Sequence, residues 1–125
     1  MPRVVFLVAL AMLAAAAFAS ACGGTAAPAA KVDPGELDGR TLYAATCAAC
    51  HGPDLKGTPT GPPFLNVIYE PSHHPDVAFL VAVRSGVRPH HWTFGAMPPV
   101  VGLSDAQVAA IVAFVRAEQQ AAGIR

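Results

Sequence analysis

The stretch Cys47-Ala48-Ala49-Cys50-His51 carries two of the three cysteines of this chain, and the third, Cys22, lies far upstream. Two thiols separated by two residues occur in redox dithiols, in zinc sites and in structural disulfides. A zinc site needs further ligands at motif spacing, and the chain has no second Cys pair. A thioredoxin-like dithiol belongs in a βαβ unit, which the helix-and-loop pattern around Cys47 does not provide. The adjacent His51 favours a different chemistry.

An imidazole directly after Cys-x-x-Cys is typical of covalent haem attachment. The thiols of Cys47 and Cys50 can form thioethers to the two vinyl groups of a haem, while His51 reaches the iron from one face. Aromatic residues make up only 7% of the sequence, beside 11 glycines and 12 prolines. Such a chain has a small core to offset the entropy of ordering, and a haem would supply the missing core. We therefore expect one covalently bound haem c.

The N-terminal residues have the three-part pattern of an export signal. Arg3 precedes an unbroken apolar run from Val4 to Phe18, and small residues then lead to Cys22. The pattern resembles a bacterial lipoprotein signal, in which the cysteine is lipidated and becomes the new N-terminus. We expect residues 1–21 to be the signal and residues 22–32 to be the lipidated cysteine and a flexible tether.

Two other fates of this segment fit the same residues. The signal could be cleaved in the ordinary way after Ala19-Ser20-Ala21, or the apolar run could be retained as a short membrane anchor. All three alternatives place a single domain, residues 33–125, outside the cytoplasm. With the lipid anchor, that domain would be attached to the membrane and face the periplasm or extracytoplasmic space.

The charge balance limits the partners that this domain can recruit. The 125 residues suffice for one ordinary domain, and eight basic residues balance eight acidic ones. A near-neutral domain offers no basic surface for nucleic acid. We therefore expect protein partners and no nucleic acid.

Apolar periodicity and capping residues predict helices joined by long loops. The first helix is expected to begin with Asp33 as its N-cap and to run through Gly39 to Cys47, so that the cysteine stretch closes it. A second helix is expected from Pro75 to near Gly86, and the last from Ser104 to near Gly123.

The last helix and the long middle loop carry the clearest signals. Ser104 and Gln107 are spaced as a capping box, and Leu103 can form a hydrophobic staple with Val108. One apolar stripe then follows at helical spacing: Val108, Ile111, Val112 and Val115. Residues 52–71 are dense in Gly and Pro, which indicates a long ordered loop with at most one helical turn. A large ligand would hold such a loop.

With these residues in place, the chain resembles the class I cytochrome c family, a monohaem family. The resemblance rests on the cysteine stretch, on Gly39 and Tyr43 before it, and on Gly61-Pro62, Ala96-Met97-Pro98-Pro99 and a terminal helix with Phe114. It implies an all-α fold in which several helices and long loops wrap around one haem. It also implies that the N- and C-terminal helices cross, with Gly39 allowing close approach to the turn of Phe114.

The second axial ligand of the iron is expected to be Met97, the only methionine that remains after the signal. Proline and glycine neighbours stiffen its loop, and the resemblance places such a methionine opposite His51. The other candidates are four loop histidines, for which solvation is the favoured interpretation: His73, His74, His90 and His91. Of these, His90 and His91 could replace Met97 in the oxidised state.

Four further residues are candidates for the surroundings of the haem. The resemblance implies that the Pro62 carbonyl accepts a hydrogen bond from the His51 ring, which would orient it. Arg84, Arg88 and Trp92 carry donors suited to haem propionates, although surface charge and packing explain them equally well.

The resemblance implies an electron-transfer protein, and not an enzyme, cycling Fe(III)/Fe(II) between membrane-associated respiratory or dehydrogenase partners. The alternatives are a cytochrome c subunit of a larger oxidoreductase and a haem enzyme or sensor with a displaceable distal ligand. A single haem motif and the lack of a conspicuous acid/base pair near Met97 argue against independent catalysis.

Overall fold

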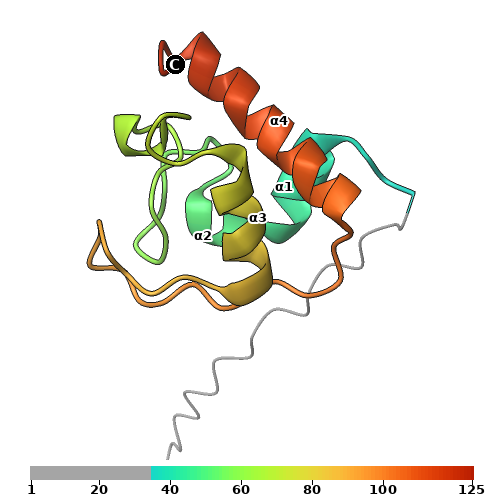
Figure 1. Ribbon diagram of the computed structural model, residues 1–125, viewed down its shortest axis with the longest axis horizontal. Coiled ribbons are helices and arrows are strands. Elements are labelled where there is room, and N and C mark those ends of the chain that lie inside the picture. The colour runs from blue at the N-terminus through green and yellow to red at the C-terminus, as the bar shows by residue number, and fades with distance from the viewer. Residues whose placement is uncertain (1–34) are drawn as a thin grey trace, which may run out of the picture.

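The computed structural model describes residues 35–125, which fold as helices joined by long loops (Figure 1). The elements in chain order are α1 (Gly39–Thr46), α2 (Ala48–His51), a short 3-10 helix η1 (Val67–Tyr69), α3 (Asp76–Ser85) and α4 (Asp105–Ala121). Residues 35–125 contain no β-strand, only two isolated bridges. The expectation of an all-α fold is confirmed. The expected signal, Cys22 and the tether lie outside the described residues.

The first helix begins later than the sequence predicted. Its N-cap is Asp38, whose carboxylate accepts a hydrogen bond from the backbone N–H of Thr41 at 2.9 Å. The helix ends at Thr46, and a separate turn, α2, follows from Ala48. The cysteine stretch therefore spans the junction between two helices, because Cys47 caps both of them.

The other two predicted helices are confirmed at both ends. Helix α3 starts after Pro75 and stops at Gly86, which takes the positive φ of 72° that a residue without Cβ adopts at no steric cost. At the start of α4, Ser104 and Gln107 form the expected capping box, with bonds of 2.9 and 3.2 Å between their side chains and each other's backbone N–H.

Helix α4 packs across α1 and against α3 (Figure 1). The core between these helices and the middle loop consists of eight buried side chains: Leu42, Tyr43, Leu55, Leu103, Val108, Ile111, Val112 and Val115. The apolar stripe predicted on the last helix is thus its buried face. Within residues 35–125, none of the helices is both long and apolar enough to span a bilayer.

The crossing of α1 and α4 depends on Gly39. A Cβ built at Gly39 would lie 2.0 Å from the carbonyl oxygen of Ala110 and 2.9 Å from Cβ of Phe114. Real side chains do not approach a backbone oxygen so closely, so only glycine fits at this crossing. The close approach expected from the resemblance is confirmed.

We expect Gly39→Ala to destabilise the protein by about 2 kcal/mol, because the gain of up to ~1 kcal/mol in helix propensity is outweighed by the displaced crossing. Denaturant unfolding of the two proteins measures the change. Gly95→Ala is the matched control, since a Cβ there meets nothing within 4 Å. Equal stability of the two variants would show that the helices tolerate a wider crossing.

Candidate functional site

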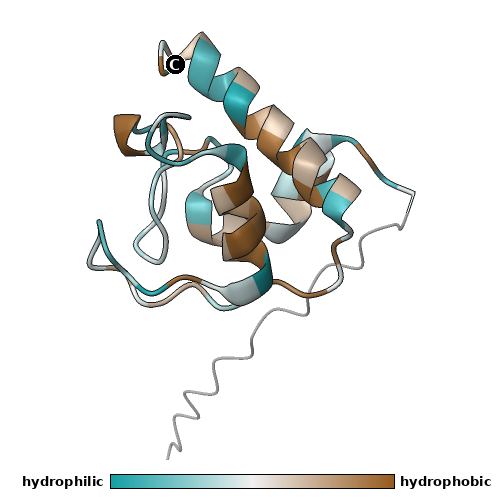
Figure 2. Ribbon diagram, viewed as in Figure 1, coloured by the Kyte–Doolittle hydropathy of each residue, from teal (hydrophilic) through white to brown (hydrophobic). Residues whose placement is uncertain are grey.

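A cavity of about 710 Å³ lies among α2, α3, α4 and the loops that connect them. Its volume is in the range of sites for organic ligands, about 300–1,000 Å³. Hydrophobic residues line most of it. Figure 2 shows that α3 and α4, which contribute to the lining, carry hydrophobic stretches. Its lining includes most of the candidate residues: Cys47, Cys50, His51, Pro62, Arg88, Trp92 and Met97. The fold therefore brings together residues that lie far apart in the sequence.

His51 ends α2 with its ring buried and oriented. Its Nδ1 lies 2.9 Å from the carbonyl oxygen of Pro62, which only accepts, so Nδ1 carries the proton and donates. The ring also stacks on Phe64, with centroids 4.1 Å apart. Burial lowers the pKa of His51, against the opposing effect of the Pro62 hydrogen bond. The result is a neutral imidazole whose Nε2 keeps its lone pair, which is the form that ligates metals.

The two thiols lie at one side of the same cavity, one turn apart. Cys50 is exposed, whereas Cys47 is half-buried and its pKa is raised by burial. Thr46 Oγ1 lies 3.3 Å from the Cys47 sulfur and opposes that rise. Both thiols are free, so both are open to covalent attachment at the wall that also carries His51.

The loop after α2 is held under that helix by close backbone packing. Thr58 Oγ1 donates to the Cys50 carbonyl at 2.6 Å, and a Cβ on Gly61 would come as near as 2.6 Å to the same oxygen. The backbones of Thr58 and Gly61 pair with each other. This packing brings the Pro62 carbonyl to the ring of His51, so the long loop serves to orient the imidazole.

Met97 is half-buried and lines the cavity from the loop between α3 and α4. Its backbone forms a bridge with Val87, with N···O distances of 2.9 and 3.0 Å in the two directions. A Cβ on Gly86 would lie 2.5 Å from the Met97 carbonyl oxygen, so glycine is required where the loop returns to the end of α3. The methionine is thereby fixed to the scaffold and not left on a free loop.

The three donors expected near haem propionates have different surroundings. Arg84 is not part of the cavity lining: its guanidinium donates to the Leu103 carbonyl at 2.8 Å and to Asp105 at 2.5 Å, tying α3 to the start of α4. The structure thus gives Arg84 a role between two helices and no support for the expected role near a propionate. Arg88 and Trp92 do line the cavity.

Trp92 has an unusual indole. Its Nε1 is buried and makes no well-formed hydrogen bond among residues 35–125, although it lies near enough to the Tyr69 hydroxyl to affect the pKa of that group. Burial raises the pKa of the Tyr69 phenol, and the nearby indole opposes that rise. A buried donor without a well-formed hydrogen bond is energetically unfavourable, so this N–H is suited to an acceptor on a bound group.

The four loop histidines come together, which the sequence did not predict. His74, His90 and His91 line the edge of the cavity, while His73 lies beside them outside its lining. Ring centroids of neighbouring pairs lie between 4.4 and 5.9 Å apart.

The sequence did not predict the role of a buried arginine that holds the backbone beside the cavity. Arg116, on α4, is 9% exposed and donates to Asp76, to Gln119 and to the carbonyls of Tyr69 and His74. It continues the apolar stripe of α4 at helical spacing, and this was the available signal. A charge on a buried face is rare unless its donors are satisfied, so Arg116 implies a set of acceptors.

Phe64 and Tyr43 are two further residues whose place near His51 emerges only from the structure. Phe64 covers the ring of His51, and the Tyr43 hydroxyl donates to the Gly52 carbonyl at 2.6 Å. The hydrogen bond of Tyr43 joins α1 to Gly52, the residue that follows His51.

Residues 37–118 match the family model described as Cytochrome c. The match covers α1, α2, η1 and α3, α4 as far as residue 118, the cysteine stretch and Met97. No curated protein matches the chain.

Proposed function

Because the chain belongs to the cytochrome c family, which binds haem c covalently and transfers electrons, we propose that it is a monohaem electron carrier. It would pass single electrons between redox proteins without transforming a substrate. The observation that carries this proposal is that His51, two thiols and Met97 all line one largely apolar cavity.

The residues of the cavity fit haem c. Two free thiols are available for the vinyl groups, and His51 has an unprotonated Nε2 for the iron. The buried Nε1 of Trp92 and the guanidinium of Arg88 are donors for the two carboxylates of the group. Bound haem supplies a metal that changes between ferric and ferrous charge, and an apolar lining limits the access of water to it.

The proposed iron ligands are His51 and Met97. The Pro62 hydrogen bond fixes the His51 ring and makes it a stronger donor. Met97 would offer a soft thioether to the iron from a backbone held by Val87. A methionine and a histidine together favour a higher potential than two histidines.

The surface at the mouth of the cavity is suited to contact with an apolar surface of a partner protein. Val77 and Val81 of α3 line the cavity and are 60% and 54% exposed. Arg88 is the only Lys, Arg, Asp or Glu residue in the lining. We therefore assign partner contact to a small apolar patch around α3.

Cytochrome c domains usually work outside the cytoplasm, and the proposal includes a lipid anchor at Cys22. The signal-like residues and the Gly- and Ala-rich tether in the sequence support it. The carrier would then act among membrane-associated donors and acceptors within reach of its tether.

A redox titration followed by optical spectroscopy on the exported, haem-loaded protein tests the carrier proposal. We expect one reversible one-electron transition and a low-spin spectrum in both states, because both axial positions are filled by the chain. Added carbon monoxide or peroxide is expected to leave the spectrum unchanged. A high-spin ferric form that reacts with peroxide would instead identify a haem enzyme, and co-purification with a larger oxidoreductase would identify a subunit.

A further inference from the structure

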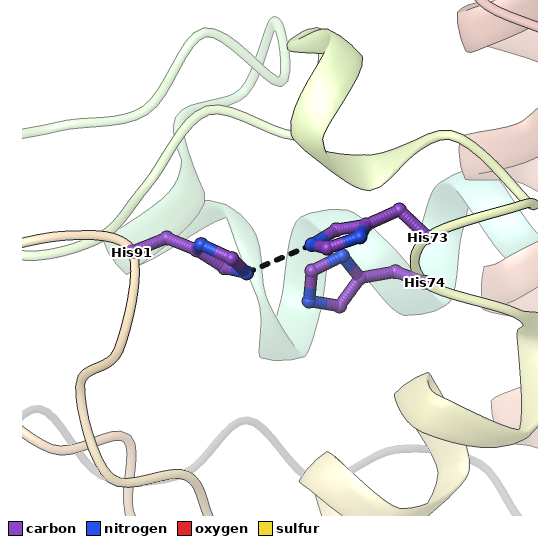
Figure 3. A group of neighbouring side chains, drawn as sticks. All are labelled: His73, His74 and His91. Carbon is purple, nitrogen blue, oxygen red and sulfur yellow. Dashed lines mark hydrogen bonds between the residues drawn. The ribbon is translucent and has the colours of Figure 1, made fainter.

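Three imidazoles from two separate segments converge beside the haem cavity (Figure 3). The ligand atoms of His73, His74 and His91 all lie within 4.8 Å of one another. The Nε2 atoms of His73 and His91 are hydrogen-bonded at 3.1 Å, although the residues are 18 positions apart in sequence. Figure 3 shows the ring of His91 pointing from its loop toward the other two.

The spacing of these nitrogens suits a metal ion. A tetrahedral Zn²⁺ with metal–nitrogen distances of about 2.0–2.1 Å holds its ligands roughly 3.3 Å apart. The His73–His91 pair is already near that separation, and small side-chain rotations would bring in His74.

The ring of His74 has the orientation and the tautomer that a metal ligand needs. Its Nδ1 lies 2.6 Å from the carbonyl oxygen of Ile68, and a carbonyl only accepts, so Nδ1 carries the proton. The lone pair is therefore on Nε2. A histidine that donates one ring N–H to a carbonyl and ligates through the other nitrogen is the usual arrangement at protein metal sites.

The backbone that carries His73 and His74 is held in place. Their N–H groups both donate to the Glu70 carbonyl, at 3.0 and 2.8 Å, and the His74 carbonyl accepts from the buried Arg116. Two of the three ligands thus need little ordering before an ion binds, which favours affinity.

The cluster is separate from the proposed iron ligands. His73 is exposed and is not part of the cavity lining. His74 and His91 do line the edge of the cavity, but the Nε2 of His91 is directed at His73. From these contacts we propose that His73, His74 and His91 form a second metal site, which takes one borderline divalent transition-metal ion such as Zn²⁺. Neutral imidazoles suit Zn²⁺, Cu²⁺ and Ni²⁺ and discriminate against Mg²⁺, which prefers oxygen ligands.

An ion at this site would join two segments of the distal side. His91 lies on the loop that carries Met97, and His73 and His74 precede α3. The site would therefore fasten the methionine loop to the rest of the domain and restrict its movement.

Titration of the haem-loaded, full-length protein with ZnCl₂ in a calorimeter tests the proposal. We expect one ion to bind per chain and no binding of MgCl₂. His73→Ala and His91→Ala are each expected to weaken Zn²⁺ binding at least about 100-fold, because each removes a direct ligand. The matched control is His90→Ala: this neighbouring imidazole bonds to the Arg88 carbonyl at 3.0 Å and lies outside the group of three. It is expected to change the affinity less than about threefold.

Two further measurements separate this site from the iron. Zn²⁺ is expected to raise the melting temperature of the wild type and of His90→Ala, but not of His91→Ala. The haem spectrum is expected to stay the same on addition of Zn²⁺. The proposal is overturned if Zn²⁺ does not saturate at one ion, if His90→Ala weakens binding as much as His91→Ala, or if His91→Ala changes the ferric spectrum.

Discussion

Met97→Ala is expected to abolish the weak far-red absorption band that methionine sulfur gives to ferric haem, and to lower the reduction potential by on the order of 100 mV. The reason is that Met97 offers the cavity its only thioether among residues 35–125, from a backbone fixed by Val87. Alanine would remove the proposed ligand and leave the iron to water or to a harder nitrogen ligand. Optical spectra and a redox titration of the haem-loaded variant measure both effects.

Val100→Ala is the matched control for this experiment. Val100 is also half-buried, lines the same cavity and is held by a backbone bond to Val83 at 2.8 Å. Its truncation opens the cavity without removing a ligand, so the band should remain and the potential should move much less. If Met97→Ala keeps the band while His90→Ala or His91→Ala changes the spectrum, the iron is bound by a histidine and the assignment of Met97 is wrong.

Arg116→Ala is expected to lower the free energy of unfolding of the haem-loaded protein by about 4 kcal/mol. The guanidinium is nearly buried and donates to four acceptors, which lie on η1, on the loop before α3, on α3 and on α4. Without it, the carbonyls of Tyr69 and His74 lose a charged donor in a place that water reaches poorly. For a domain whose total stability is about 5–15 kcal/mol, this is a large share. Denaturant unfolding followed by far-ultraviolet circular dichroism measures it.

Arg40→Ala is the matched control, since Arg40 has an equally short ion pair on the surface. Its guanidinium lies 2.6 Å from Glu118, but its side chain is 67% exposed. Such a pair contributes less than about 1 kcal/mol. Arg116→Lys should recover only part of the loss, because an ammonium group does not reproduce the planar fork. Equal effects of Arg116→Ala and Arg40→Ala would show that burial of the guanidinium contributes little.

The ends of α3 and α4 were predictable because short-range chemistry fixes them. Ser104 and Gln107 satisfy each other's backbone N–H groups, and Gly86 supplies the positive φ at the end of α3. The start of α1 was predicted wrongly, because Asp33 and Asp38 are both of a residue type that can cap the N-terminus of a helix. Asp38 is the cap in the structure, and it places the first helical turn, beginning at Gly39, against Ala110. That contact joins distant parts of the chain, so the sequence around Asp38 contains no pattern that predicts it.

The difference between local patterns and long-range contacts also decides which residues of the candidate site could be predicted. The cysteine stretch and Met97 could be proposed from spacing and resemblance, and the structure places them around one cavity. The bonds of Arg84 to Leu103 and Asp105 could not, since an arginine before a loop looks the same whether it faces a ligand or a helix start. The meeting of His73 with His91 likewise depends on how two loops pass each other.

The bridge between Val87 and Met97 has a consequence for local opening of the fold. Its two hydrogen bonds close the segment 88–96 at its neck, while the eight core residues lie elsewhere. Regions with few buried contacts exchange their amide hydrogens through small openings that leave the rest folded. Segment 88–96 can therefore fluctuate as one cooperative unit while α1 and α4 stay crossed. Opening of the Val87–Met97 bridge, which frees this segment and loosens the backbone at Met97, would then have its own free energy and would not require global unfolding.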